Sequence, residues 1–389
     1  MILKNVSILT AMLFLAACGG GSYESATGTS QSQSQGNCPG SDCVPDVPPP
    51  PAATPIPANA IFVSGAAELT TALQNATGGE TIVLANGNYG SLTLEKNYTS
   101  YVTIQSANPL GAFFNGIGLH NVTYVIFDGV KTTGLYMDGY STNSYWKFKN
   151  GASLNFYMGG NRDIYSVHHY EITGNTIGPS DGDYMRIAGN NHHGLVENNT
   201  FHDMVVMNPD AHPDFIQFTR SYDTGYERYT PHDITIRGNV MYDDPATGVI
   251  GTQGISVSDG GSDGYRGILI EQNMIRSVLT NAIVIHSGVE NVVVRNNTLT
   301  NGRIWVCNNQ GMGNAGTLVR DNVVPAILND GGGSTVMRNY EGVPSPTLYA
   351  SYVNGFTWQQ YVPKAAGPID FSTNYGAVAR LQQLLSGAP

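Results

Sequence analysis

The chain is poor in charged residues and in cysteine for its length. Asp, Glu, Lys and Arg make up only 12% of 389 residues, and there are 4 Cys. Lys and Arg total 18 against 29 Asp and Glu, so the formal net charge is -11. These few scattered basic residues argue against a nucleic-acid partner, although a local group of them can still bind an acidic sugar. No Cys/His spacing indicates zinc and no EF-hand-like string indicates tight calcium binding, so no cofactor is expected to be required.

Long hydrophobic runs are missing after the first eighteen residues. Lys4 precedes the apolar stretch VSILTAMLFLAAC, which is too short for a permanent membrane span, so residues 1–18 are predicted to be an export signal. LAAC resembles the bacterial lipobox, which implies cleavage before Cys18 and lipid attachment to it. Gly19 in place of Asp resembles outer-membrane lipoproteins of Gram-negative bacteria. We expect an exported protein whose only membrane contact is this lipid; an ordinary secretory signal would also export it.

Residues 19–60 have almost no apolar side chains to bury. They are rich in Ser, Gln and Gly and then in Pro, which predicts a flexible and then stiffer tether. Cys38 and Cys43 either form a small disulfide there or have no role in the folded domain. Cys307 is expected to be a packed thiol. Residues 61–389 are predicted to form a single domain that needs no partner subunit, so a monomer is expected.

A repeat ending in asparagine runs through the second half of the chain. Its copies are YEITGNTI, GLVENNTF, ITIRGNVM, ILIEQNMI, VVVRNNTL and TLVRDNVV. The shared asparagines are Asn175, Asn199, Asn239, Asn273, Asn297 and Asn322, with spacings by subtraction of 24, 40, 34, 24 and 25 residues. A base period near 24 with two longer intervals indicates a solenoid with loops inserted into some coils. Stacked at one corner, the amides can form a hydrogen-bonded ladder, and Asn tolerates a left-handed backbone there.

The alternating β-forming residues of these repeats favour strands over helices. We therefore predict an all-β fold, a right-handed parallel β-helix. Its ends need caps, because each coil buries its inner face only against its neighbours. SGAAELTTALQNA, with Ser64 as N-cap, is predicted to be an N-terminal capping helix. YGAVARLQQLLSG is predicted to be a C-terminal helix covering the last coil.

The stretch ELTTALQNATGGETIVLANGNY resembles the opening of the alginate lyase and chondroitinase B family, polysaccharide lyase family six. This resemblance covers about twenty-five residues and the coils behind them, and it implies a β-helix that cleaves an acidic polysaccharide. A second likeness is to mannuronan C5-epimerases, whose motif is Asp-Pro-His followed by an acid. Residues 210–214 read DAHPD instead, so the proline follows the histidine. The Lys/Arg pair of family six is not matched, since Lys147 and Lys149 lie on a different strand from Arg186.

A second set of strands determines which side chains face solvent. The segments YMRIA, FIQF, ISVS, IVIH and RIWVC are equivalent if their inward residues are Met185, Ile216, Ile255, Ile283 and Ile304. The two-residue period of a strand then fixes the outward positions. These are Tyr184, Arg186, Phe215, Gln217, Ser256, Ser258, Val284, His286, Arg303 and Trp305, with Tyr136, Asp138, Asn155 and Tyr157 from earlier coils. Aromatic and hydrogen-bonding side chains suit pyranose rings, which predicts a sugar-binding groove; the alternative is a solvated flank with incidental aromatics.

The loop NPDAHPD is predicted to bring an acid–base group to this groove. Pro209 and Pro213 limit the conformations around His212. His212 is the candidate base for the C5 proton of a uronate, with Asp210 or Asp214 orienting its ring. The other histidines of the repeats are expected to be structural: His168, His169, His192, His193 and His232.

Further roles follow from the chemistry of a uronate polymer. Arg186 is expected to neutralise the substrate carboxylate, because a guanidinium binds a carboxylate through two hydrogen bonds. Tyr184 is the candidate acid at the glycosidic oxygen, with Tyr157 or Tyr170 as alternatives. The expected substrate-binding residues are Gln217, Asp210, Tyr157, Ser256, His286, Arg303 and Trp305. Calcium is not expected to be required; if a calcium ion binds, its candidate ligands are the carboxylates of Asp181, Asp183, Asp210 and Asp214.

Three alternatives remain open: a lyase, an epimerase or glycoside hydrolase, and a non-catalytic glycan-binding protein. A lyase would cleave an acidic polysaccharide by β-elimination. An epimerase would use nearly the same residues, and a hydrolase would need paired carboxylates from the set Asp210, Asp214 and Asp259. A non-catalytic surface protein would only bind the glycan.

Overall fold

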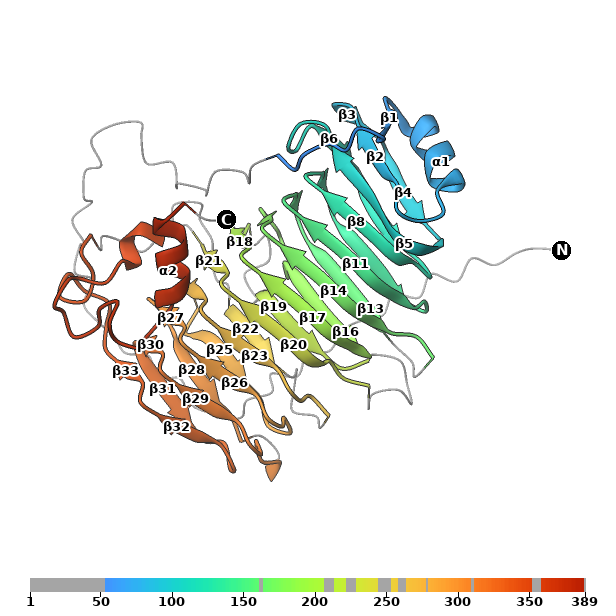
Figure 1. The fold of residues 1–389 in the computed structure, drawn as a ribbon. Coiled ribbons are helices and arrows are strands. Elements are labelled where there is room, and N and C mark those ends of the chain that lie inside the picture. The colour runs from blue at the N-terminus through green and yellow to red at the C-terminus, as the bar shows by residue number, and fades with distance from the viewer. Residues whose placement is uncertain are drawn as a thin grey trace.

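Three sheets of parallel strands wind around a common axis (Figure 1). The computed structural model describes residues 53–160, 164–205, 213–221, 229–243, 253–257, 264–277, 279–308, 311–351 and 358–387. Successive strands pass from one sheet to the next and then return one coil further on. This is the predicted parallel β-helix.

The three sheets are named A, B and C in the order in which a coil visits them. Sheet A contains β1 (Ile61–Val63), β2 (Thr81–Leu84), β5 (Asn97–Ser106), β8 (Thr123–Asp128), β11 (Asn143–Lys149), β14 (Val167–Thr173), β17 (Asn191–Glu197), β20 (His232–Arg237), β23 (Leu269–Glu271), β26 (Val293–Arg295), β29 (Leu318–Arg320) and β32 (Thr335–Met337). Sheet B contains β3 (Gly87–Asn88), β6 (Ala112–Phe114), β9 (Lys131–Thr132), β12 (Ala152–Ser153), β15 (Thr176–Ile177), β18 (Thr200–His202), β21 (Val240–Tyr242), β24 (Met274–Arg276), β27 (Thr298–Leu299), β30 (Val323–Val324) and β33 (Tyr340–Glu341). Sheet C contains β4 (Ser91–Leu94), β7 (Gly116–Leu119), β10 (Leu135–Gly139), β13 (Phe156–Gly160), β16 (Met185–Gly189), β19 (Asp214–Thr219), β22 (Gln253–Val257), β25 (Asn281–Ile285), β28 (Arg303–Val306) and β31 (Ala326–Asn329).

The core lies inside the coils and is built by one inward residue stacked on the next. In sheet C, Met185 pairs with Ile216 and Ile216 with Ile255, and the row continues through Ile283 and Ile304. All five are fully buried. The predicted inward register is therefore confirmed. Four of the five residues are isoleucines, whose β-branched side chains pack well against like neighbours on a pleated surface.

A buried row of asparagines joins the coils at the corner between sheets A and B. Each side-chain amide donates to the Oδ1 of the next asparagine at 2.9–3.0 Å. The row is Asn175, Asn199, Asn239, Asn273, Asn297, Asn322 and Asn339, so the predicted ladder is confirmed and extends one coil further. The residue before each ladder asparagine adopts the left-handed backbone conformation, as Gly174, Asn198 and Gly238 do. The ladder asparagines themselves keep negative φ, contrary to the expectation.

Both predicted helices are present, but only the N-terminal one covers an end of the solenoid (Figure 1). Helix α1 (Ala66–Asn75) has Gly65 rather than Ser64 as its N-cap. The Ser64 backbone N–H and hydroxyl instead donate to the Glu68 carboxylate, at 2.7 and 2.9 Å. Helix α2 (Val378–Leu385) buries Leu381 in a cluster with side chains of sheet B, so it packs along the flank of the solenoid rather than across its last coil (Figure 1). A short 3-10 helix, η3, spans Trp358–Tyr361.

The remaining expectations concern the cysteines, the N-terminal tether and membrane contact. Cys18, Cys38, Cys43 and the tether up to residue 52 lie outside the described residues. Cys307 is buried, as expected. No helix among the described residues is long and apolar enough to cross a bilayer.

Candidate active site

One outward residue per coil forms a continuous row on sheet C, here called the wall. Strand pairing places these residues side by side, about 4.8 Å apart from coil to coil. The wall consists of Tyr136, Tyr157, Arg186, Gln217, Ser256, Val284 and Trp305. The predicted register of the outward row is confirmed at Arg186, Gln217, Ser256, Val284 and Trp305. Tyr136 is 44% exposed, the side chains of Tyr157, Arg186, Gln217 and Trp305 are half-buried, and those of Ser256 and Val284 are buried.

Arg186 is held by a carboxylate from its own coil. Its Nε lies 3.2 Å from Asp183 Oδ2, and Nη2 donates to the same oxygen. The side chain of Asp183 is 10% exposed and that of Arg186 is 33% exposed. The second oxygen, Oδ1, accepts the backbone N–H of Asp214 at 2.9 Å. Asp183 therefore fixes the guanidinium and links two coils, while Arg186 stays accessible.

The next coil repeats this arrangement with different chemistry. Asp214 occupies the position equivalent to Asp183, and its Oδ2 accepts from the Gln217 side-chain amide at 3.1 Å. Asp214 is only 2% exposed. The two coils thus present Asp-x-x-Arg and Asp-x-x-Gln, each aspartate holding the outward residue three positions later. A positive and a neutral hydrogen-bonding group therefore stand in adjacent positions on the wall.

Aromatic rings flank these polar groups. The guanidinium of Arg186 lies 5.9 Å from the centre of the Tyr157 ring, in cation–π geometry. At the far end, Arg303 lies 4.7 Å from the centre of the Trp305 ring, and its Nε donates to Asn281 Oδ1 at 2.9 Å. The Trp305 indole donates to Asp330 at 3.0 Å. Arg303 and Trp305 therefore form a separate aromatic–cationic pair five coils beyond Tyr157.

The predicted outward orientation of Tyr184 is wrong. Its side chain is fully buried, with its ring 5.2 Å from that of Phe215 and its hydroxyl donating to the His202 carbonyl at 2.8 Å. Burial raises the pKa of Tyr184 far above the ordinary range. Phe215 is buried as well. Both residues lie where the chain turns into sheet C, and the two-residue alternation of a strand does not extend around that corner.

The remaining predicted residues have mixed outcomes. Asp210, His212 and Ser258 lie outside the described residues. Pro213, the residue after His212, is buried, and its carbonyl accepts a hydrogen bond from the Gln253 backbone N–H at 3.0 Å. His286 follows β25, and its backbone N–H donates to Val257 at 3.0 Å. The alternative acid Tyr170 is buried in sheet A, which leaves Tyr157 as the tyrosine of this set on the wall.

Sequence reasoning missed the role of Asp183. Strict alternation from Met185 points Asp183 inward, and the sequence offers it only as a calcium ligand. Its oxygens instead accept N–H groups of Arg186 and Asp214, which argues against a cation at this carboxylate. Among the described residues, no group of three or more His, Cys, Asp or Glu side chains could hold a metal ion. The repeated Asp-x-x-Arg/Gln spacing was the signal that could have identified the pairing.

The histidines expected to be structural form a stack on sheet A, away from the wall. Centroid separations are 4.9 Å for His168 and His192, 5.0 Å for His192 and His232, and 4.8 Å for His169 and His193. Nδ1 atoms of neighbouring rings lie 2.8 Å apart for His168 and His169 and 2.7 Å apart for His192 and His193. Each pair shares one hydrogen between its two Nδ1 atoms, so one Nδ1 donates it and the other accepts it.

Comparison with known proteins gives likeness only at the level of solved structures. No protein-family model matches the sequence. No curated protein matches it either. An alginate lyase from a Paenibacillus species is 15% identical with a TM-score of 0.43, covering 72% of this chain and 95% of the lyase. The pectate lyase Pel9A is 14% identical with a TM-score of 0.49, covering 77% of this chain and 84% of the lyase.

A third similar structure is the catalytic unit of a GH87 α-1,3-glucanase from Streptomyces thermodiastaticus. It is 14% identical with a TM-score of 0.46, covering 76% of this chain and 66% of the glucanase. Likeness at this level carries no argument about the reaction, so function has to be inferred from the side chains of the wall.

Proposed function

We propose that this protein is a carbohydrate-active enzyme, a polysaccharide lyase that cleaves a uronate-containing polymer on the wall by β-elimination. The observation that carries the proposal is Arg186, held by Asp183 between Tyr157 and Gln217 on consecutive coils. A fixed, accessible guanidinium beside an aromatic ring matches a sugar ring that carries a carboxylate. Gln217 adds a hydrogen-bonding group one coil further along.

The first chemical requirement is to make the C5 hydrogen of the uronate acidic. Removing it places negative charge next to a carboxylate, so that carboxylate must first be neutralised. Arg186 supplies the positive charge, and its bond to Asp183 prevents the guanidinium from reorienting during the reaction. His212, two residues before the first residue of β19 and next to the buried Pro213, is the proposed base.

The second requirement is a proton for the departing oxygen. As the base takes the C5 proton, the electrons of the C5–H bond form the C4–C5 double bond and the C4–O bond breaks. Tyr157 is the proposed acid, since Tyr184 is buried and its hydroxyl is bonded to a carbonyl. The products are a new reducing end and an unsaturated uronate.

Epimerisation and hydrolysis of the same polymer are the two alternative reactions, and each gives products different from those of elimination. Epimerisation would return a proton to the opposite face of C5 without breaking the chain. Hydrolysis would need two available carboxylates on either side of the substrate. Of the predicted set, Asp214 is buried and accepts from the Gln217 amide, and Asp210 and Asp259 lie outside the described residues. A hydrolase is therefore distinguished from a lyase by its saturated products.

The proposed location is the outer membrane, with a lipid on Cys18 and residues 19–60 as a tether. This placement would hold the wall at the cell boundary, where polymeric glycan is met. Mass spectrometry of the N-terminal peptide from the native host tests it: a diacylglyceryl-modified Cys18 is expected, and an unmodified mature terminus at another residue would contradict it.

The reaction is tested by incubating the purified chain with alginate, polygalacturonate and hyaluronan. Ultraviolet absorbance of the C4–C5 double bond should rise with at least one polymer and should disappear in His212→Ala. Proton NMR of the same samples detects epimerisation, which would change the uronate composition without cleavage. Release of saturated oligosaccharides would indicate a hydrolase, and binding without any change in the polymer would indicate a glycan-binding protein.

A further inference from the structure

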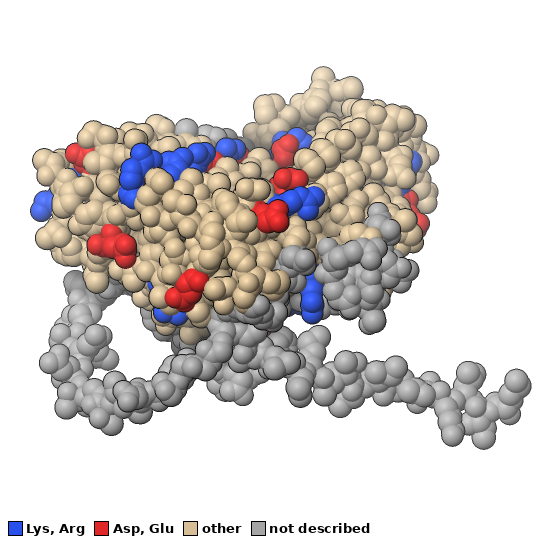
Figure 2. Space-filling view, turned by 90° about the horizontal axis from the view of Figure 1, so that it is seen from below, with Lys and Arg blue, Asp and Glu red and all other residues tan. Residues whose placement is uncertain are grey.

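A row of arginines lies on sheet A, on a different side of the solenoid from the wall. Figure 2 shows basic side chains gathered in a row on one face of the molecule. Strand pairing aligns Glu197, Arg237, Glu271, Arg295 and Arg320 on successive coils, and Arg338 follows on the next one. Four steps of about 4.8 Å separate the coils of Arg237 and Arg338, roughly 19 Å in all.

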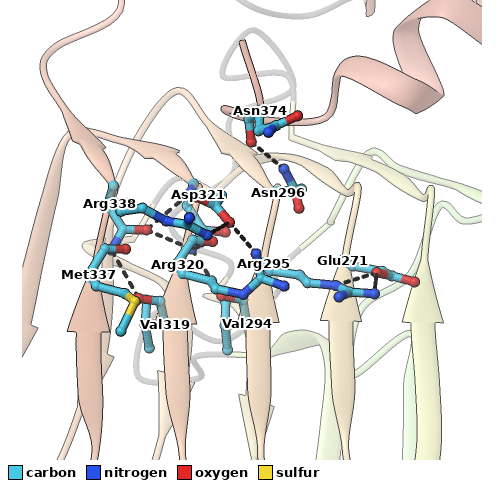
Figure 3. Close-up of polar contacts among 12 residues, drawn as sticks. Glu271, Val294, Arg295, Asn296, Val319, Arg320, Asp321, Met337, Arg338 and Asn374 are labelled. Carbon is cyan, nitrogen blue, oxygen red and sulfur yellow. Dashed lines mark hydrogen bonds and ion pairs between the residues drawn. The ribbon is translucent and has the colours of Figure 1, made fainter.

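The acidic partners of these arginines lie within the row or next to it, and two of them are almost fully buried. Glu271 accepts from Arg295 at 2.7 Å, and Asp321 accepts from Arg338 at 3.0 Å (Figure 3). The side chains of Glu271 and Asp321 are 10% and 5% exposed, whereas those of Arg295 and Arg338 are 36% and 62% exposed. Arg237 is 42% exposed and pairs with Glu197 on the neighbouring coil, whose side chain is 26% exposed. The groups that meet solvent are therefore mainly guanidiniums.

A buried guanidinium adds to the positive charge. Arg380 of α2 is 7% exposed, and within the described part of the chain its Nε and Nη1 have no hydrogen-bond partner. Burial lowers the pKa of Arg380 to about 10, so it remains charged at neutral pH. Its Cδ lies next to Gly238, the residue after Arg237. Counting Arg380, the region holds five guanidiniums against Glu197, Glu271 and Asp321, a local excess of 5 − 3 = +2 in a chain of net charge -11.

We propose that the arginine row is a second binding surface for a linear anionic polysaccharide. The choice of polymer rests on the proposed function, because the wall would act on the same kind of chain. Guanidiniums spaced along the axis match carboxylates repeated along a polymer. The row contains no aromatic side chain on which bases could stack, which disfavours single-stranded nucleic acid. By holding one stretch of polymer, the row raises the local concentration of the rest near the wall.

The test uses the full chain with His212→Ala, so that turnover cannot consume the polymer. The variant Arg237→Gln/Arg338→Gln removes two guanidiniums and leaves Arg295 with Glu271 and Arg320 with Asp321, so the most buried carboxylates keep their partners. The matched control is Lys131→Gln/Lys364→Gln, the same change in net charge at two exposed sites outside the row. Equal thermal midpoints of the two variants confirm that both fold.

Binding is measured by affinity electrophoresis in gels containing alginate, polygalacturonate, hyaluronan or a neutral glucan. We expect the row variant to bind one or more of the uronate polymers roughly three- to tenfold more weakly at low salt, with the difference vanishing at high salt. The control variant should bind like the parent. Equal binding of the row variant and the parent, or no binding of the parent to any uronate polymer, would overturn the proposal. Failure of the lyase assay alone would not, since this measurement needs no turnover.

Discussion

Arg186 lies three positions after Asp183 on the same coil, and its guanidinium Nε is 3.2 Å from the Asp183 carboxylate Oδ2. The same carboxylate accepts a backbone N–H from the next coil. This pairing fixes a positive charge at one point of an otherwise aromatic and neutral wall. The proposed chemistry depends on it, because a substrate carboxylate has to meet a guanidinium already in place.

Loss of the Asp183 charge should impair turnover more than folding. We expect Asp183→Asn to lower kcat/KM by roughly tenfold or more, because Arg186 loses the partner that positions it. The amide oxygen can still accept the Asp214 N–H, so the fold should be retained. Steady-state kinetics check this, with exposed Glu95→Gln as control. Unchanged kinetics in Asp183→Asn would show that Arg186 needs no positioning.

Two tyrosines one coil apart should behave in opposite ways. Tyr157→Phe should lower kcat by roughly 10²- to 10⁴-fold, the usual contribution of a general acid. Tyr184→Phe should leave turnover nearly unchanged and cost about 1–2 kcal/mol of stability, because it leaves the His202 carbonyl without its donor. Kinetics and urea unfolding of both variants separate the roles. Near-normal turnover in Tyr157→Phe would remove it as the acid.

The asparagine ladder should contribute strongly to stability. Asn273 donates to Ile236 O and Asn297 Oδ1, and its own Oδ1 accepts from the Asn239 backbone and side chain. We expect Asn273→Ala to lower the free energy of unfolding by about 3 kcal/mol or more, since several buried groups lose partners. The exposed Asn308→Ala is the control. Equal urea midpoints for the two variants would contradict a stabilising ladder.

The histidine stack should make the fold sensitive to acid. Burial, and then the neighbouring His168 and His232, lower the pKa of His192 to about 4. The unfolded chain binds this proton near its ordinary pKa of about 6.5. Between these values the unfolded state holds more protons, so stability is fully present above pH 6.5 and falls as the pH drops toward 4.

Thermal midpoints measured across this pH range check the expectation. The decline should be shallower in His192→Asn than in the wild type. His120→Gln, outside the stack, should follow the wild type. Identical slopes in all three proteins would show that the stack does not govern the acid response.

The fold and the register of the wall could be predicted from the sequence because both follow from periodicity. The asparagine spacing marks the coils, and residues such as Ile216 and Ile255 mark the inward side of each strand. Corners have no such period. Tyr184 was therefore assigned to the wrong face, and Asp183 was missed as the partner of Arg186.

The contacts between segments far apart in the chain could not be predicted from the sequence pattern either. Helix α2 was expected from its amphipathic spacing, but its position on the flank depends on the fit of Leu381 to sheet B. The burial of Glu271 and Asp321 among the arginines of the row likewise follows from the stacking of coils, which places residues far apart in the chain side by side.

The most direct test of the wall as a reaction site is the rate of double-bond formation in Arg186→Gln. The substrate is the polymer on which the wild type is most active, and Arg266→Gln is the matched control, since this arginine is exposed and lies outside the wall. We expect the ultraviolet signal to fall roughly a hundredfold or more in Arg186→Gln and to remain at the wild-type rate in Arg266→Gln. Wild-type turnover in Arg186→Gln would place the chemistry elsewhere on the molecule.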